Sequence, residues 1–216
     1  MTLTNGNALA GRLAKSALDL NIPMWLASPV RELVMEADAV RGAIVEKDGK
    51  PIRVIARHGV VLACGGFPHD IARRKALFPH APTGMEHYSP GPAGNTGDGL
   101  RLAEAAGGRI DDTLPNAAAW VPVSLPPRKD GSTGVMPHFI DRAKPGVIAV
   151  NKDGKRFGNE TDSYHDFVQQ MMKEAKPGEE LAAFLLCDHR TLRKYGLGCV
   201  SRHCRCRSDV ISARDI

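Results

Sequence analysis

A cation, a carboxylate and a phenol lie close together in the stretch from Val150 to Phe167. They are Arg156, Glu160 and Tyr164, and a turn sequence, Asn-Lys-Asp-Gly, comes just before them. Arginine stays charged and can orient an anion or a carbonyl group. Tyrosine can donate or accept a proton when neighbouring groups hold its phenol. The same residues also fit a solvated hairpin and a helix cap, since long polar side chains are mostly exposed. Both interpretations stay open on this stretch alone.

Two glycine-bearing turns offer backbone that a ligand could approach closely. The first ends an apolar run and precedes a predicted helix, and glycine there leaves room for a ligand. The second opens a further predicted helix, whose free N–H groups favour an anion or a polar ring edge. Such turns and caps are common, so a purely structural role fits each of them as well. The residues of the two turns are Ala63, Cys64, Gly65, Gly66, Thr96, Gly97, Asp98 and Gly99.

The composition limits the classes of partner. The chain has 216 residues, of which 43% are hydrophobic and 25% charged, which is ordinary for one soluble domain or pieces of two. The net charge of +5 comes with only 5% aromatic residues and no interleaving of aromatic with basic side chains, so nucleic acid is not an expected partner. No apolar run approaches the ~18 residues of a membrane span. We therefore predict a cytoplasmic protein with a small-molecule substrate and no membrane partner.

The cysteines do not predict a metal site. Cys64 and Cys187 lie in apolar runs, where we expect reduced thiols in the core. After Gly198 the sequence loses periodicity and turn signals, and we interpret it as disordered or aberrant. The spacing in that tail is wrong for a structural zinc site. Its possible ligands are Cys199, His203, Cys204 and Cys206.

Periodicity and turn signals predict an alternation of helices and strands. The predicted helices are 7–20, 68–78, 98–106, 163–175 and 189–196. The predicted strands are 29–35, 41–47, 52–63 and 181–188, with a hairpin at 146–157. Residues 79–98 and 111–145 are predicted to be irregular.

The motifs, taken in order, resemble the flavoprotein family of fumarate reductase and 3-ketosteroid dehydrogenase. They are NGNAL, LACGGF, NTGDGLRLAEAAGG, DRAKPGVIAVNKDGKRFGNE and SYHDF. The resemblance covers residues 5–198 and looks closest to the ketosteroid dehydrogenase branch. It implies an α/β FAD-binding domain with an α+β cap domain. We expect residues 5–108 to be the later part of the FAD-binding domain, 109–198 a partial cap domain and 199–216 an unmatched tail.

The resemblance also implies roles for particular residues. In this family the two glycine turns line FAD. Tyr164 matches a tyrosine that takes a proton from the carbon next to a carbonyl while FAD takes a hydride. Arg156 matches the proton donor of fumarate reductases, and Arg142 is similar to its relay partner. The expected activity is dehydrogenation or reduction of a carbon–carbon bond next to a carbonyl, on a steroid-like ketone or a dicarboxylate.

The sequence also departs from the family in two places. The opening strand, Gly-x-Gly-x-x-Gly turn and helix that hold a dinucleotide are missing, and the match stops near Gly198. We therefore expect a fragment that binds FAD weakly or not at all and is inactive as an isolated chain. Cys64 stands where the family usually has threonine or serine. Two alternatives stay open: a fumarate-type reductase with an arginine acid, and a non-catalytic fragment without cofactor.

Overall fold

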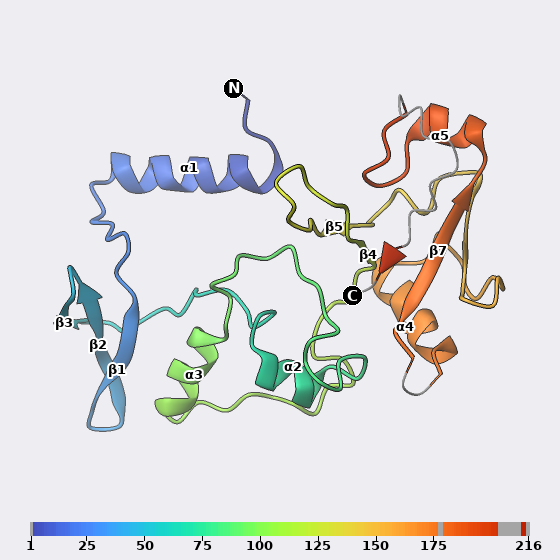
Figure 1. The fold of residues 1–216 in the computed structure, drawn as a ribbon. Coiled ribbons are helices and arrows are strands. Elements are labelled where there is room, and N and C mark those ends of the chain that lie inside the picture. The colour runs from blue at the N-terminus through green and yellow to red at the C-terminus, as the bar shows by residue number, and fades with distance from the viewer. Residues whose placement is uncertain (1, 177–178, 203–212, 215–216) are drawn as a thin grey trace. The chain divides into compact units, whose positions relative to one another are not determined.

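The computed structural model describes residues 2–176, 179–202 and 213–214 (Figure 1). Contacts between Cα atoms divide the chain into two compact units. The first consists of Met1–Leu62 with Ala105–Gly107, and the second of Ala63–Glu104 with Gly108–Ile216.

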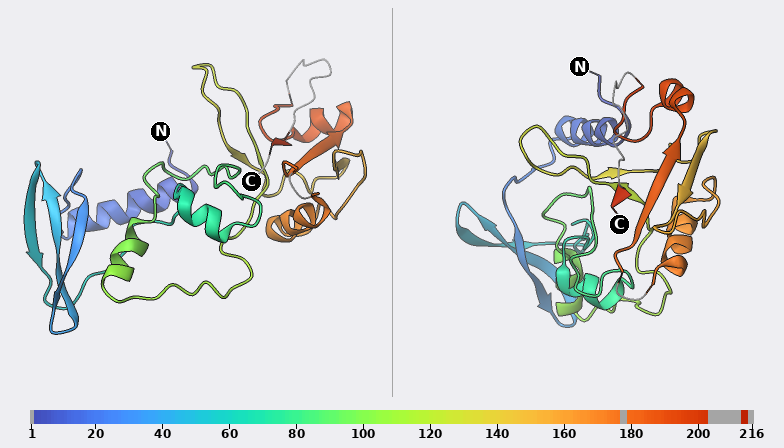
Figure 2. Two further views of the ribbon diagram at one scale, coloured as in Figure 1. Left: turned by 60° about the horizontal axis from the view of Figure 1, so that its bottom comes forward. Right: turned by 45° about the vertical axis from the view of Figure 1, so that its right-hand side comes forward.

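The first unit combines one helix with an antiparallel sheet. Helix α1 is Asn5–Asp19, and the strands are β1 Val30–Glu36, β2 Ala39–Lys47 and β3 Lys50–Ile55. β2 pairs with both β1 and β3, as Figure 2 shows. Both hairpin turns have two residues with positive φ, Ala37 and Asp38 in one and Asp48 and Gly49 in the other. This conformation matches the right-handed twist of the flanking strands.

Helix α1 confirms the predicted first helix, but its apolar face is exposed. No residue of α1 is buried, and Leu9 and Leu13 are each 62% exposed.

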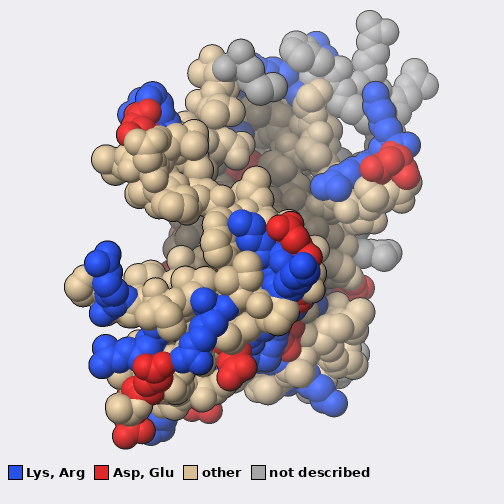
Figure 3. Space-filling model, turned by 90° about the vertical axis from the view of Figure 1, so that its left-hand side faces the viewer, with Lys and Arg blue, Asp and Glu red and all other residues tan. Residues whose placement is uncertain are grey.

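On the face of the molecule in Figure 3, Lys and Arg lie next to Asp and Glu, so charges of both signs are mixed there. The exposed pairs Arg31–Glu46 and Arg53–Glu36 on the sheet follow the same pattern.

The second unit contains short helices and two small antiparallel sheets. Its helices are α2 Ile71–Leu77, α3 Asp98–Ala105 (which ends in the first unit), α4 Tyr164–Glu174 and α5 His189–Tyr195. Its strands are β4 Val123–Ser124, β5 Met136–Pro137, β6 Val147–Val150, β7 Ala182–Cys187 and β8 Ala213–Arg214. β4 pairs with β5, and β7 lies between β6 and β8.

One hydrophobic core holds this second unit together. Phe78, Trp120 and Phe167 lie in it, and the rings of Phe78 and Trp120 meet edge to face at 4.9 Å. Phe67 and Phe157 pack against the same core. Phe67 directly follows the first glycine turn and Phe157 directly follows Arg156, so both segments are anchored to the same set of side chains.

The mixed fold and most of the predicted elements are confirmed, with two corrections. The predicted hairpin at 146–157 is reduced to its turn and one bridge, Val150 to Arg156, because β6 pairs with β7 instead. The third predicted strand ends at Ile55 and does not reach residue 63. Gly59 follows with φ +133, a conformation outside the strand region.

The prediction of core thiols was wrong for Cys64, which is exposed, and Cys187 is only partly buried. The division into 5–108 and 109–198 stays a prediction. Most of the tail at 199–216, including His203, Cys204 and Cys206, lies outside the described residues.

Candidate active site

The two glycine turns lie against each other. The N–H of Gly97 donates to the carbonyl of Gly66 at 3.3 Å. Gly65 has φ +78, and a Cβ there would lie 2.5 Å from Oδ1 of Asn95. Since an L side chain rarely adopts that φ and would also collide with Asn95, this position requires glycine. The two turns therefore form one platform, made of residues 63–66 and 94–99.

The surface of this platform fits a cofactor that approaches the backbone. Residues 63–66 are all exposed, and Cys64 has the largest side chain among them. A Cβ added at Gly99 would lie 3.4 Å from Cβ of Cys64, so the start of α3 adjoins the first turn. Helix α3 is 8 residues long and offers free N–H groups at that end. Its Asp98 carboxylate accepts from the Thr96 hydroxyl at 3.3 Å and can also accept from ligand hydroxyls.

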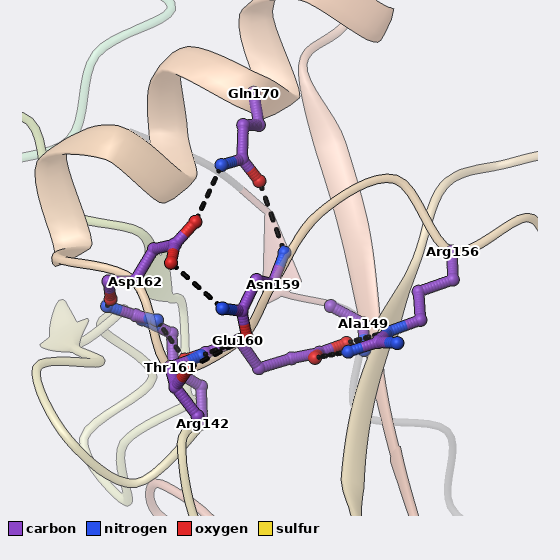
Figure 4. A network of polar contacts seen from close by, with 8 residues as sticks. All are labelled: Arg142, Ala149, Arg156, Asn159, Glu160, Thr161, Asp162 and Gln170. Carbon is purple, nitrogen blue, oxygen red and sulfur yellow. Dashed lines mark hydrogen bonds and ion pairs between the residues drawn. The ribbon is translucent and has the colours of Figure 1, made fainter.

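Arg156 and Glu160 form a two-point ion pair (Figure 4). Nε and Nη2 of Arg156 donate to the two carboxylate oxygens at 2.9 and 2.5 Å, and the N–H of Ala149 donates to Oε1 at 2.8 Å. Burial by itself would raise the pKa of Glu160, but the hydrogen bonds from Arg156 and Ala149 and the charge of Arg156 lower it to about 2. The hydrogen bonds to Glu160 and its charge raise the pKa of Arg156. The pair is thus fully ionised at neutral pH.

Arg142 reaches the same loop from the opposite side. Its side chain is 2% exposed, Nη1 donates to the carbonyl of Glu160, and Nη2 donates to the carbonyl of Asp162 at 2.7 Å. The guanidinium also lies over the ring of Phe167 at 4.8 Å. Burial lowers the pKa of Arg142, although nearby carboxylates oppose that shift. The structure therefore brings Arg142 and Arg156 together on Glu160, one on its carbonyl and one on its carboxylate.

Three polar side chains that the sequence did not single out hold this loop against α4. Asp162 accepts from Nδ2 of Asn159 at 2.9 Å and from Nε2 of Gln170 at 2.8 Å. Oε1 of Gln170 accepts from the backbone N–H of Asn159 at 3.2 Å. Figure 4 shows the closed triangle that they form. The Asn-Glu-x-Asp motif can be recognised in the sequence. Nothing in the sequence relates this motif to Gln170, which lies a helix turn and a half further on.

Tyr164 is the first residue of α4 and its side chain is partly exposed. The helix begins with a reciprocal cap, because Oγ of Ser163 accepts from the N–H of Asp166 and donates to its carboxylate. The ring of Phe139 meets the Tyr164 ring edge to face at 5.3 Å. Phe139 is 49% exposed and Ile140 is 77% exposed. The Tyr164 ring thus lies against an exposed apolar side chain, Phe139, that sequence patterns did not identify.

A cavity of about 270 Å³ adjoins the first glycine turn. Gly66, Phe67, Phe78, His87 and Trp120 are among the residues that line it. Burial lowers the pKa of His87 to about 3, so its ring is neutral at neutral pH and the walls carry little charge. An apolar pocket with flat walls suits a flat ring.

The wall of this cavity is tied to the helix that carries Tyr164. The backbone N–H of Trp120 donates to Nδ1 of His165 at 3.1 Å. Within the described part of the chain, no hydrogen bond joins Tyr164 to Arg142 or Arg156. The predicted residues therefore form two clusters, the glycine platform and the Arg142–Arg156–Glu160 group, with Tyr164 beside Phe139 as a further surface feature.

Comparison with known proteins assigns the chain to a family. The model of the FAD binding domain family matches residues 1–214, and the chain belongs to this family. FAD is therefore the cofactor of its family, as the sequence predicted.

The chain is similar to several dehydrogenases. It is 42% identical over 196 residues to 4-oxocyclohex-2-ene-1-carboxylate 5-dehydrogenase of Sinomonas cyclohexanicum, covering 90% of this chain and 33% of that protein. It is 33% identical over 202 residues to 3-oxosteroid 1-dehydrogenase of Mycobacterium tuberculosis, covering 88% and 34%.

A solved structure gives the same result. The crystal structure of 3-ketosteroid Δ1-dehydrogenase from Sterolibacterium denitrificans, in complex with 1,4-androstadiene-3,17-dione, matches with a TM-score of 0.79 and 32% identity. The match covers 91% of this chain and 35% of that structure. The chain thus spans about a third of the length of the relatives it matches. In the part of the chain that the structure describes, no helix is long and apolar enough to cross a membrane.

Proposed function

We propose that this chain supplies part of an FAD-dependent dehydrogenase that oxidises a carbon–carbon bond next to the ketone of a cyclic, largely apolar substrate. The observation that carries the proposal is the position of Tyr164, on the first turn of α4 with its ring against Phe139 and next to exposed apolar side chains. Two of the relatives, an oxocyclohexene carboxylate dehydrogenase and a 3-oxosteroid dehydrogenase, are named for cyclic ketones, which supports the choice of a cyclic ketone.

The proposed reaction removes two hydrogens from adjacent carbons. Oη of Tyr164, as the phenolate, takes a proton from the carbon next to the carbonyl, whose C–H bond the ketone makes more acidic, and becomes a phenol. FAD, when bound, supplies the acceptor for the hydride from the neighbouring carbon. The pair of electrons left in the C–H bond that Tyr164 breaks then forms the C=C double bond. Phe139 and Ile140 would contact the ring of the substrate and exclude water from the phenol.

We assign the two glycine turns to the cofactor. Residues 63–66 and 96–99 would hold FAD, since residues 63–66 and Asp98 are exposed and the start of α3 presents N–H groups without bulky side chains. The cavity beside Gly66 would accept a flat ring. The assignment of 109–198 to a cap domain belongs to the same proposal.

Arg142 and Arg156 complete the proposed site, in a structural and electrostatic role. Arg156 would be a poor proton donor, because the ion pair with Glu160 raises its pKa. A carbonyl or carboxylate of the substrate could still be oriented by the exposed side of the Arg156 guanidinium, which is 56% exposed at its side chain.

The test uses the purified chain with added FAD and a dye as electron acceptor. The substrates are 4-androstene-3,17-dione, 4-oxocyclohexanecarboxylate and, for the alternative reaction, fumarate with a reduced dye. Although the sequence predicts an inactive isolated chain, the glycine platform and Tyr164 lead us to expect slow turnover of a cyclic ketone with FAD in large excess. Tyr164→Phe should reduce this turnover by roughly 10²-fold or more, because the proton acceptor is lost. Tyr195→Phe, which removes a phenol elsewhere, serves as the control and should keep activity. Turnover of fumarate alone would overturn the proposal.

Substrate binding is measured as well as turnover, because the chain spans only about a third of the length of its relatives. Tryptophan fluorescence would report association of either ketone. A chain that neither binds nor turns over a cyclic ketone, with FAD present, would contradict the proposed function and favour the non-catalytic alternative.

A further inference from the structure

A buried chain of hydrogen bonds lies next to Phe139 and has no part in the function proposed so far. Oγ of Ser124 lies 2.5 Å from Nε2 of His138, and Nδ1 of His138 lies 2.6 Å from Oδ2 of Asp141. Ser124 and His138 are each 3% exposed. An ionised carboxylate only accepts hydrogen bonds, so Nδ1 carries a proton and donates to Asp141, while Nε2 and the serine hydroxyl share the second hydrogen bond.

This order of serine, histidine and carboxylate is also found in hydrolases, but here it does not fit nucleophilic catalysis. A nucleophile must reach its substrate, whereas the Ser124 side chain is buried in the two-residue strand β4. The chain instead fixes backbone. His138 is held by both ring nitrogens and by its own N–H, which donates to the carbonyl of Pro122 at 2.8 Å.

The segment 138–142, which we call the strap, is anchored at both ends. At one end His138 is held by Ser124 and Asp141. At the other end Arg142 donates to the carbonyls of Glu160 and Asp162. Both anchors are buried polar groups, and releasing either would leave unpaired donors or acceptors in the interior, which is costly.

Between the anchors, the strap exposes two apolar side chains. Phe139 is 49% exposed and lies against Tyr164, and Ile140 is 77% exposed. Exposed apolar residues held on a rigid segment are the usual form of a binding surface, since little motion remains to be frozen when a ligand arrives. The strap is held by His138 and Arg142 on either side of Phe139 and Ile140, and not by burial of these two apolar side chains.

We infer that His138, through its contacts with Ser124 and Asp141, is a positioning residue that sets Phe139 against Tyr164 and thereby determines the affinity for a cyclic ketone. The inference rests on the proposed function for its ligand. Its structural part, that His138 fixes the Phe139–Tyr164 contact, does not depend on any ligand.

The ligand-free test follows Tyr164 directly. The chain has three tyrosines, Tyr88, Tyr164 and Tyr195, so uniform labelling with 3-fluorotyrosine gives three fluorine resonances, and Tyr164→Phe assigns one of them. We expect His138→Phe to shift or broaden the Tyr164 resonance and leave the other two in place. His189→Phe, at an exposed histidine on α5, is the matched control and should change none. An unchanged Tyr164 resonance in folded His138→Phe would overturn the inference.

A second variant moves the ring without removing its hydrogen bonds. A Cβ at Gly198 would lie 2.6 Å from Cε1 of His138, so Gly198→Ala should push the imidazole and also perturb the Tyr164 resonance. His138→Gln, which keeps a polar group near Ser124, should restore part of the wild-type spectrum. If His138→Phe does not fold, these two variants carry the test.

The ligand test separates this inference from the proposed function. With 4-androstene-3,17-dione as probe, His138→Phe should weaken binding about tenfold or more, as expected when a contact surface is displaced. In turnover the change should fall on KM more than on kcat, since Tyr164 itself is kept. If the wild type binds and His138→Phe binds equally well, the inference fails and the function stands. If the wild type does not bind, the function fails, and the fluorine spectra still decide whether His138 positions Phe139.

Discussion

Glu160 is the buried partner and Arg156 the exposed partner of their ion pair, with side chains 5% and 56% exposed. The carboxylate also accepts from the buried N–H of Ala149. Glu160 therefore has two roles: it forms an ion pair with Arg156, and it accepts a hydrogen bond from the N–H of Ala149. Substitutions at Glu160 can separate the contributions of these two contacts to stability.

Glu160→Gln should cost less stability than Glu160→Ala. Glutamine keeps an acceptor for Ala149 but loses the charge and the acceptor for Nη2 of Arg156, whereas alanine also leaves the Ala149 N–H unpaired, which costs about 1–3 kcal/mol more. Urea denaturation at pH 7 measures both. Arg101→Ala, which removes an exposed pair with Asp98 in the same unit, should stay within about 0.5 kcal/mol of wild type. Equal effects of the two Glu160 variants would refute the role of the Ala149 contact.

The two histidines beside Trp120 should make the protein acid-sensitive. Burial is the main cause that lowers the pKa of His80 to about 4 and of His87 to about 3. Between pH 6.5 and 4 the unfolded chain binds protons that the folded chain does not, so the free energy of unfolding falls as pH falls. The expected loss is roughly 2–4 kcal/mol between pH 7 and pH 4.5. Denaturation at several pH values checks it.

A variant and a second pH window test the cause. His87→Phe should flatten this dependence by removing one titrating group. Glu160, whose pKa is lowered to about 2, contributes its own loss of stability only as pH falls below its ordinary value. A wild-type protein with constant stability between pH 7 and pH 5 would contradict the burial of the histidines.

Gly65→Ala should separate the two glycine turns. The added methyl would have both an unfavourable φ and a collision with Asn95, whereas at Gly154, φ +75, it would meet open space. Gly154→Ala therefore measures the conformational cost alone, about 1–2 kcal/mol. Gly65→Ala should cost more and should also weaken FAD binding, followed by flavin fluorescence. An equal loss of stability in both variants would mean that the Asn95 side chain moves away from the added methyl at little cost.

Ser163→Ala should affect Tyr164 as well as stability. It removes the reciprocal cap with Asp166 and frays the first turn of α4, at a cost of about 0.5–2 kcal/mol. Asp188→Ala removes the corresponding cap of α5, where Oδ1 accepts from the N–H of Thr191. Only Ser163→Ala should change the fluorine resonance of Tyr164. A change with Asp188→Ala instead would place Tyr164 nearer to α5 than the structure has it.

Local signals predicted the elements well. α1 and α4 have an apolar face of helical period, and the glycine after α3 marks its end. The pairing of β6 could not be predicted, since its partner β7 lies beyond α4 and the turn at Asn151 pointed to a hairpin. Strand pairing depends on contacts far apart in sequence, whereas a turn signal reports only its immediate neighbours.

The candidate site was predicted only in part, for a similar reason. The glycine turns were found because glycine marks unusual backbone, and the structure brings them together. Ser124 and His138 lie in a segment without periodicity, and nothing in the sequence pairs them. Only the close spacing of His138 and Asp141 in the sequence indicates that these two side chains could contact each other. Phe139 and Ile140 were overlooked because an apolar residue in an irregular segment is ordinarily taken for local packing.

The strap has a consequence for how such a protein can change over generations. Its anchors are buried and its two apolar side chains are exposed, so replacements of Phe139 or Ile140 disturb little of the interior. Surface substitutions of this kind usually alter stability by less than about 0.5 kcal/mol. If Phe139 and Ile140 contact the substrate as proposed, a lineage could exchange them while folding remains under separate constraint. New preferences for the substrate ring would then be open to selection one substitution at a time.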